Sequence, residues 1–321
     1  MTPEPLTPGS IVDDVYRAVL GREADAVGRA HALSSLDAGM SVAVLIANML
    51  DSAEYRRTQA DGALAFRRSK PVCTLIEDRL RLWIDLVDRH VSLACLAEAY
   101  EPSETRFVLS NLKAGDTFLD IGANVGWFAI QAADRVGSAG RVHAFEPRAL
   151  TARLLERSIA DNGFGDRCAL HAVALGAEDG AGRLLGHETS TNLGGFRLAR
   201  NDDDIFDGMT SEEVRVVTLD SLGIAPGVRL IKLDVEGAEP HVLIGARALI
   251  ARDRPLILTE VFEPGLLQVS GMDGAAYAAL IRTLGYAIHA LEDGQTGAEI
   301  ADAALVGGVD PINVVLVPTG A

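Results

Sequence analysis

Length, composition and charge set the first bounds on this protein. The chain has 321 residues, of which 48% are hydrophobic and 23% are charged. These proportions are ordinary for a soluble globular protein, and the length allows two domains. The formal net charge is −16 at pH 7. An acidic chain gains nothing from releasing the counterions of DNA or RNA, so we do not expect nucleic-acid binding.

Cysteine usage and hydropathy bear on the compartment. The three cysteines lie in apolar surroundings without a C-x-x-C pair, which predicts buried thiols and not a disulfide framework. The first ten residues lack the basic and apolar regions of a secretory signal. The longest apolar stretch, residues 42–50, is too short to cross a bilayer. We therefore expect a cytoplasmic protein without a transmembrane segment.

The first hundred residues predict a tail, a small helical domain and a connector. Prolines and a glycine in residues 1–10 are typical of a flexible tail. Residues 11–60 carry apolar faces at helical spacing over two or three helices, with Gly21 as a stop signal and Ser41 as an N-cap. Residues 61–100 are predicted as a connector followed by a helix.

The connector contains a short basic run and then an apolar stripe. We expect the basic run to be solvated and not a binding patch; it consists of Arg67, Arg68 and Lys70. The stripe predicts one helix and comprises Ile76, Leu80, Trp83, Ile84, Val87 and Val91. Trp83 is expected in the core.

From residue 101 to 321 the pattern alternates between strands and helices. Strands are predicted at Thr117–Ile121, Arg141–Phe145, Ala169–Ala174, Leu230–Val235, Pro255–Val261, Ala287–Leu291 and Asn313–Val317. Helices are predicted at Trp127–Arg135, Thr151–Asp161, Pro240–Ile250 and Ala275–Leu284. This alternation predicts an α/β, doubly wound, Rossmann-like sheet covered on both faces. Residues 177–228, which include the acidic run Asp202–Asp204, are predicted as an insertion of short strands and loops.

Acidic residues follow several of the predicted strands, where open parallel sheets bind ligands. The stretch "FLDIGANVGWFAI" places Asp120 before Gly122, Asn124 and Gly126. Dinucleotide sites use G-x-G-x-x-G to hold a pyrophosphate at a helix N-terminus, and a carboxylate there would repel that anion. A carboxylate favours an ammonium group, such as the one on the methionine half of S-adenosylmethionine.

A second acid supports the same cofactor. Glu146 follows the next predicted strand, 26 residues after Asp120, where an acid accepts hydrogen bonds from ribose hydroxyls. The two acids together predict S-adenosyl-L-methionine as the cofactor. The alternative left open is an α/β fold whose strand-end acids only cap helices.

Residues from about 100 to 262 resemble the FkbM-type methyltransferase family. The resemblance is carried by "YEPSET", "AGDTFLDIGANVGWFAI", "RVHAFEP", "VTLDSL", "LIKLDVEGAEPHVLIGA" and "RPLILTE". It implies a class I S-adenosylmethionine-dependent fold with strand order 3-2-1-4-5-7-6 and an antiparallel seventh strand. It also implies methylation of a hydroxyl oxygen, often on a sugar or a natural product. This sequence departs from the family at His241 and Ser158, which leaves the acceptor open.

The expected site has a cofactor side and an acceptor side. The cofactor-binding residues are expected to be Asp120, Gly122, Ala123, Asn124, Gly126, Trp127, Glu146, Pro147, Ala174 and Asp234. The resemblance adds Glu101 and Thr105 on the lid side of the cofactor, and the alternative for this stretch is helix capping by Ser103 with nearby charges. A hydroxyl acceptor needs a nearby base, and the catalytic candidates are Asp234, Glu236, Glu239 and Glu260. Glu239 alternatively caps the following helix, and His241 is expected to be packed or solvated. These carboxylates can also hold Mg²⁺, but we expect them to bind acceptor hydroxyls and predict no metal site.

Two further features of the sequence bear on the site. Lys232 shares a strand face with Asp234, and it is predicted to pair with a strand-end acid because an unpaired buried lysine is costly. Asn192, Gly194 and Gly195 indicate either a close backbone approach to the acceptor or a plain turn.

The helical residues 11–57 resemble a second family, a small domain of unassigned function in bacterial surface and glycan-related proteins. "YRAVLGREADAVG", "LDAGMSV" and "LDSAEYRR" carry this resemblance. Its signature residues Asp25 and Gly28 are individually expected to fix the turn between two helices. We expect the domain to dock a glycan or a protein.

The sequence therefore predicts an S-adenosylmethionine-dependent O-methyltransferase acting on a saccharide, glycoconjugate or related small molecule. The alternative is a catalytically silent methyltransferase fold that binds glycans or acts as a scaffold. A nicotinamide dehydrogenase is disfavoured because the third glycine of its fingerprint is missing.

Overall fold

The computed structural model divides into two compact units. The N-terminal unit comprises Met1–Tyr100, Ala160–Asn162 and Thr189–Gly194. The sheet unit comprises Glu101–Ile159, Gly163–Glu188 and Gly195–Ala321. The structure describes residues 7–50, 52–55, 69–88, 90–187, 192, 194–199 and 209–320. The predicted features at residues 1–6, Arg67, Arg68 and Asp202–Asp204 lie outside the described residues.

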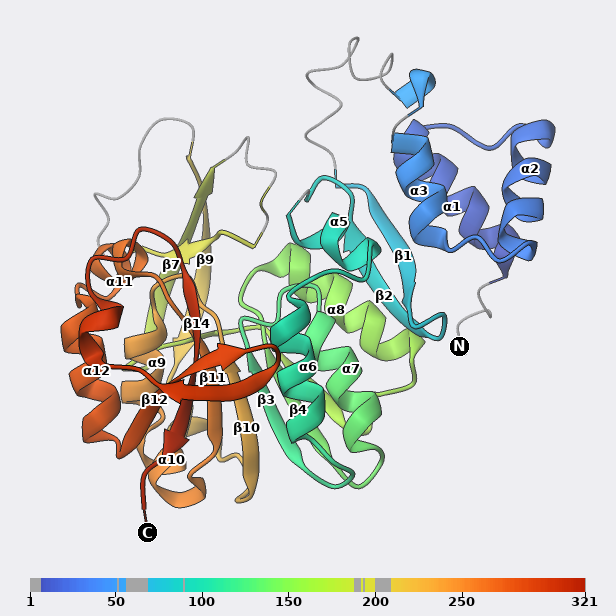
Figure 1. Cartoon of the computed structure of the whole chain (residues 1–321). Coiled ribbons are helices and arrows are strands. Elements are labelled where there is room, and N and C mark those ends of the chain that lie inside the picture. The colour runs from blue at the N-terminus through green and yellow to red at the C-terminus, as the bar shows by residue number, and fades with distance from the viewer. Residues whose placement is uncertain are drawn as a thin grey trace. The chain divides into compact units, whose positions relative to one another are not determined.

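Three helices open the N-terminal unit (Figure 1), which confirms the predicted helical character of this region. They are α1 (Pro8–Leu20), α2 (Ala26–Asp37) and α3 (Val42–Leu50). Gly21 ends α1 at φ 69°, and the Ser41 hydroxyl accepts the Val44 N–H at 3.3 Å, as predicted.

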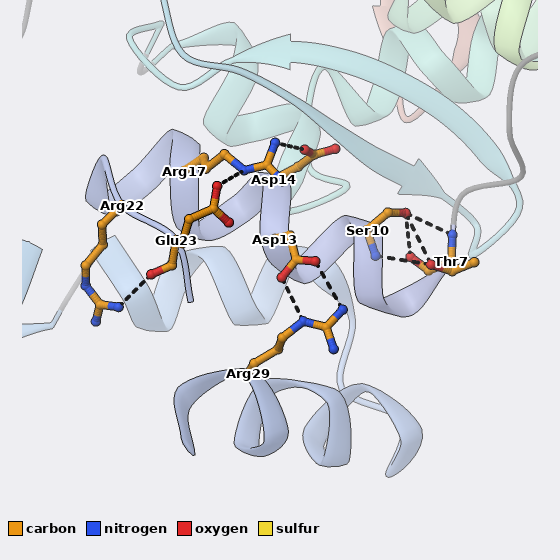
Figure 2. Close-up of polar contacts among 8 residues, drawn as sticks. All are labelled: Thr7, Ser10, Asp13, Asp14, Arg17, Arg22, Glu23 and Arg29. Atoms are coloured by element: carbon orange, nitrogen blue, oxygen red, sulfur yellow. Dashed lines mark hydrogen bonds and ion pairs between the residues drawn. The ribbon is translucent and has the colours of Figure 1, made fainter. Parts of the chain in front are cut away.

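The predicted tail is wrong for residues 8–10, which form the first turn of α1. Thr7 and Ser10 form a capping box, each side chain accepting the other's backbone N–H (Figure 2). Pro8 stands at the start of the helix, where its missing N–H costs nothing. The proline that indicated flexibility therefore begins a helix.

The signature residues of the N-terminal unit have structural roles. Asp25 caps α2 by accepting the Gly28 N–H at 2.8 Å, which confirms the turn interpretation. Arg22 binds both carboxylate oxygens of Glu54, at 2.6 and 3.0 Å. Arg29 makes the equivalent paired contact with Asp13, tying α2 to α1 (Figure 2).

The predicted helix stripe before residue 91 is wrong. The chain forms an antiparallel hairpin of β1 (Pro71–Ile76) and β2 (Leu80–Asp85), followed by the short helix α5 (Val91–Leu96). Glu77 and Asp78 adopt positive φ in the turn, and the apolar residues on either side of it lie on two strands. Trp83 is 3% exposed, so its predicted core position is confirmed.

The sheet unit contains an eight-stranded sheet with the order β13-β12-β14-β11-β10-β3-β4-β5 (Figure 1). The strands are β3 (Thr117–Ile121), β4 (Arg141–Phe145), β5 (Cys168–His171), β10 (Val228–Leu233), β11 (Leu256–Val261), β12 (Tyr286–Glu292), β13 (Gln295–Glu299) and β14 (Ile312–Pro318). Strand β14 is antiparallel to both of its neighbours. Apart from the added edge strand β13, this is the expected 3-2-1-4-5-7-6 order, so the predicted fold is confirmed.

Helices cover both faces of this sheet (Figure 1). They are α6 (Pro102–Asn111), α7 (Trp127–Val136), α8 (Ala149–Asp161), α9 (Glu239–Gly245), α10 (Arg247–Asp253), α11 (Glu263–Val269) and α12 (Gly274–Thr283). The single helix predicted over Pro240–Ile250 is divided at Ala246 into α9 and α10. Helix α11 was not predicted.

The residues between β5 and β10 form a second sheet in the order β6-β9-β7-β8. Its strands are β6 (Ala174–Leu175), β7 (Gly180–His187), β8 (Arg197–Leu198) and β9 (Met209–Val217). The sequence predicted Ala174 at the end of the strand Ala169–Ala174, and this is wrong. The chain leaves the main sheet after His171, and Ala174 lies in β6 of the second sheet.

Successive side chains of β3 point to opposite faces of the sheet, one towards the hydrophobic core and one towards the candidate site. Leu119 and Ile121 belong to the hydrophobic cluster that includes residues of α9, α10 and α12. Asp120 points to the opposite face, as does its register partner Lys232 on β10. Asp120 and Lys232 therefore lie on the face of the sheet that is covered by the helices α6 and α7.

No helix within the described parts of the chain is long and apolar enough to cross a membrane. All three cysteines are buried free thiols, as predicted.

Candidate active site

The glycine turn after β3 is built by backbone geometry. The N–H groups of Gly122 and Ala123 both donate to the Phe145 carbonyl, at 3.0 and 2.9 Å. Gly122, Asn124 and Gly126 have φ values of 86°, 49° and 95°, in the left-handed region that favours glycine and tolerates asparagine. The predicted use of these residues as a turn is therefore realised.

Two close approaches explain the glycines. A Cβ on Gly122 would lie 1.8 Å from the backbone oxygen of Asp234, and a Cβ on Gly126 would lie 2.3 Å from Leu155 Cδ1. The first contact joins the turn to the loop after β10. The turn and that loop therefore form one edge of the site.

Glu146 is buried at the end of β4 and holds the glycine turn. Its Oε2 accepts the Asn124 N–H at 2.9 Å. Its Oε1 accepts the Arg148 N–H at 2.9 Å and the Thr151 hydroxyl at 2.8 Å. Burial raises the pKa of Glu146, and the three hydrogen bonds oppose that shift. Because a carboxylate has about four acceptor positions, one remains on Oε2 for a ligand hydroxyl.

Asp120 is completely buried, and neither of its carboxylate oxygens has a hydrogen-bond partner among the described residues. Burial raises its pKa to about 7, against the opposing positive charge of Lys232. Asn124 Oδ1 is likewise buried without a partner in the described part of the chain. Unpaired buried polar atoms are costly, so these three oxygens fit a ligand that donates hydrogen bonds.

Lys232 is 4% exposed, and its ammonium group is surrounded by acids. Nζ lies 2.8 Å from Asp234 Oδ2 and 3.5 Å from Glu101 Oε2, and it sits 4.6 Å from the centre of the Phe128 ring. The predicted pairing of Lys232 with a strand-end acid is confirmed. Burial alone would lower the pKa of Lys232, but the neighbouring carboxylates outweigh burial and raise it.

The three remaining carboxylates differ in their partners. Glu239 Oε1 accepts the N–H groups of Val235 and Gly237, at 2.9 and 3.3 Å, which ties down the loop before α9. Glu236 lies at φ 56° in that loop, and Glu260 lies on β11. The carboxylates of these two residues make no hydrogen bond or ion pair with any described residue. Burial, together with the charge of Asp234, raises the pKa of each of these two to about 8.

Helix α6 contributes further contacts. Trp127 Nε1 donates to the Thr105 hydroxyl at 2.9 Å, which links α6 to α7 beside the glycine turn. Glu101 precedes α6 with φ 42°. The sequence analysis missed Asn313, which pairs with Glu260 in the sheet and donates to Glu104 Oε1 at 2.7 Å. A lone asparagine at the start of an apolar strand was the available signal.

Of the other predicted site residues, two lie at the edge formed by the glycine turn and Glu146, and the rest lie elsewhere. Ala123 lies within the turn, Pro147 follows Glu146, and Ala174 is buried in the second sheet. Asn192 accepts the Gly194 N–H at 3.0 Å, which favours the turn interpretation of that stretch. Over the described residues, no group of three or more His, Cys, Asp or Glu side chains is arranged to hold a metal ion.

Comparisons with known proteins were made for the whole chain. Residues 120–288 match the model of the methyltransferase FkbM domain. No curated protein sequence matches.

Solved structures with similar folds include three methyltransferases. Methyltransferase FkbM from Methylobacillus flagellatus KT is 17% identical, with 91% of this chain and 71% of that chain covered and a TM-score of 0.41. A SAM-dependent O-methyltransferase from Thermotoga maritima is 13% identical over 78% and 80% of the two chains, with a TM-score of 0.39. A putative rRNA methylase from Clostridium thermocellum is 13% identical over 67% and 94%, with a TM-score of 0.40. At these scores the likenesses carry no further argument.

Proposed function

Because the chain belongs to the FkbM methyltransferase family, whose reaction is methyl transfer from S-adenosylmethionine, we propose that it methylates a hydroxyl oxygen. We propose a saccharide, a glycoconjugate or a related natural product as the acceptor. The observation that carries this proposal is the pair Glu236 and Glu260, two carboxylates without partners among the described residues beside Asp234. Carboxylates bind hydroxyl groups and accept their protons.

The cofactor side of the site fits S-adenosylmethionine. The buried oxygens of Asp120 lack donors within the described residues and suit the ammonium group of the methionine half. Glu146 retains one acceptor position for a ribose hydroxyl, while its other bonds fix the turn. Close approach of Asp234 to Gly122 and of Leu155 to Gly126 leaves no room for side chains at these glycines, so the turn that carries Asn124 is packed firmly in place.

The cofactor supplies an activated methyl group on a sulfonium, so the protein's own work is alignment, exclusion of water and removal of the acceptor proton. A base is most effective when its pKa lies near the working pH. Glu236 and Glu260, with pKa values raised to about 8, meet that condition. Asp234 is paired with Lys232 and orients the acceptor, and Glu239 holds the loop that carries Glu236.

Two matched variants test these roles. Glu236→Gln and Glu260→Gln remove a proton acceptor and keep the shape of the side chain; the general-base contribution is about 10²–10⁴-fold. We expect one of them to lower kcat by at least about 10²-fold without changing affinity for S-adenosylhomocysteine. Transfer of labelled methyl groups to a panel of mono- and oligosaccharides is the measurement, with Glu213→Gln on β9 as the control.

Three outcomes would contradict parts of the proposal. No binding of S-adenosylhomocysteine would remove the cofactor assignment. Tight binding with no transfer to any hydroxyl acceptor would favour the catalytically silent alternative. Full activity in both glutamine variants would remove the assignment of the base.

The role of the N-terminal helical domain remains a separate proposal. We propose that it docks a glycan or a protein partner, on the basis of its resemblance to domains of glycan-related proteins. Its signature residues do not carry this proposal, because Arg22 and Asp25 are engaged in structural contacts. Loss of acceptor binding after removal of residues 1–57, with intact cofactor binding, would support docking.

A further inference from the structure

Three carboxylates compete for one buried ammonium group at the ends of β3 and β10. Lys232 contacts Asp234 at 2.8 Å and Glu101 at 3.5 Å. Asp120 is its partner in the parallel register, yet both Asp120 oxygens lack a hydrogen-bond partner among the described residues. The ammonium group of Lys232 therefore contacts Asp234 and Glu101 and makes no hydrogen bond to Asp120.

The protonation of the three acids follows from this geometry. With all three ionised, one positive charge would face three negative charges in a site sheltered from water. A buried carboxylate that lacks donors is the one that is neutralised most readily. Asp120 meets that description, and its pKa is raised to about 7, while Asp234 and Glu101 lie in direct contact with the lysine ammonium group.

The groups that face Asp120 come from four elements. They are Lys232 and the following Asp234 from β10, Glu101 from the start of α6, and Cys168 from β5. Burial raises the pKa of Cys168 to about 12, so that thiol stays neutral. Helix α7 contributes the Phe128 ring, which lies against Lys232. The backbone N–H of Ala129 on α7 also opposes the rise in the pKa of Asp120. The proton on Asp120 is thus favoured by burial and by the two neighbouring acids, and disfavoured by the lysine and by this N–H.

We propose that Lys232 is a positioning residue that reserves Asp120 for the cofactor, so that cofactor binding expels a proton. This inference rests on the proposed cofactor site. When the ammonium group of the methionine half reaches Asp120, the carboxyl O–H bond breaks and the proton leaves to solvent. The resulting carboxylate receives hydrogen bonds from the ligand's ammonium group.

Proton release is measurable without turnover. Isothermal titration of the full chain with S-adenosylhomocysteine, in buffers of different ionisation enthalpy, gives the number of protons released. From a free pKa of about 7, we expect about 0.9 proton released at about pH 6 and about 0.1 at about pH 8. The dissociation constant should fall about tenfold over the same range.

Variants assign the proton to this site. Asp120→Asn cannot release it, so the heats should become independent of the buffer and the affinity should no longer depend on pH in this window. Asp116→Asn is the matched control, because Asp116 lies at the other end of β3 and its carboxylate accepts the Lys113 N–H at 2.9 Å. That control should release protons as the wild type does.

Lys232 is tested through the pH at which release occurs. Lys232→Arg keeps the positive charge and should keep the release near its wild-type pH. Lys232→Met removes the charge that stabilises ionised Asp120 and should move the release to higher pH; a thermal melt shows whether this variant is folded. If it is not folded, Asp120→Asn and Lys232→Arg still decide the matter.

The outcomes separate the two proposals. Absence of S-adenosylhomocysteine binding at every pH overturns the cofactor site itself. Binding without proton release, or the same release in Asp120→Asn, leaves the cofactor site standing and overturns the present inference. A release that does not move in folded Lys232→Met overturns the role given to the lysine.

Discussion

Gly122→Ala tests the joint between the glycine turn and the loop after β10. Its φ of 86° lies in the left-handed region, where alanine costs about 1–2 kcal/mol. The new methyl group would lie 1.8 Å from the Asp234 backbone oxygen, so that carbonyl must move; overpacking of this kind costs about 1–3 kcal/mol. We expect a total loss of about 2–5 kcal/mol in the free energy of unfolding of the sheet unit.

The assay uses the two tryptophans of the chain. In a Trp83→Phe background, denaturant unfolding followed by the fluorescence of Trp127 reports on the sheet unit. Gly115→Ala is the matched control: its φ is 90°, but a Cβ there meets nothing within 4 Å. The control should lose only about 1–2 kcal/mol.

Affinity for S-adenosylhomocysteine supplies the second readout of the same pair. Moving the Asp234 carbonyl shifts the edge of the site, and each 1.4 kcal/mol of lost binding energy is about tenfold in the dissociation constant. We expect at least a tenfold loss for Gly122→Ala and none for Gly115→Ala. Equal effects of the two substitutions on stability and affinity would refute the packing argument.

Three more predictions follow from buried polar groups. Glu146→Gln places a donor among backbone donors, so we expect about 1–3 kcal/mol of destabilisation and weaker S-adenosylhomocysteine binding, measured by thermal melts and titration. Thr105→Val removes the acceptor of the Trp127 indole N–H; stability should fall by about 1 kcal/mol with a shift in Trp127 emission. Burial and the adjacent His171 lower the pKa of His143 to about 4, so the unfolded chain binds more protons, and stability should fall as the pH drops from about 6.5 to 4. His143→Asn should flatten that dependence in denaturation curves taken across the window.

The sheet was predictable because its strands carry their own signals. Thr117–Ile121 and Arg141–Phe145 were placed with the same ends as the structure gives them, since continuous apolar runs bounded by turn residues are typical of buried parallel strands. The hairpin β1-β2 was mistaken for part of a helix because four of its apolar residues, together with Val87 and Val91, also fit a helical spacing. Only the positive φ of Glu77 and Asp78, which residue type did not indicate, turns the chain back on itself.

The location of the candidate site residues in the fold was predictable, and the contacts among them were not. Strand-end position placed Asp120, Glu146 and Asp234 at one edge of the sheet, since the carboxyl ends of parallel strands meet there. Which of these acids forms an ion pair depends on the distance from each carboxylate to the ammonium group of Lys232. That distance is set by side-chain conformation and cannot be derived from the sequence. The sequence accordingly predicted a partner for Lys232 without predicting that Asp120 would be left without one.

The loop after β10 shows how one residue type acquires two roles within a few positions. Glu239 begins α9, and its carboxylate accepts hydrogen bonds from two backbone N–H groups of the preceding loop. This side chain therefore holds the loop in place. Glu236 stands at the φ of 56° that this loop imposes, and its carboxylate has no hydrogen-bond partner in the described part of the chain. A strained backbone persists only where the surroundings hold it. The hydrogen bonds of Glu239 therefore maintain the loop conformation in which Glu236 keeps its carboxylate unpaired, as its proposed role as a base requires.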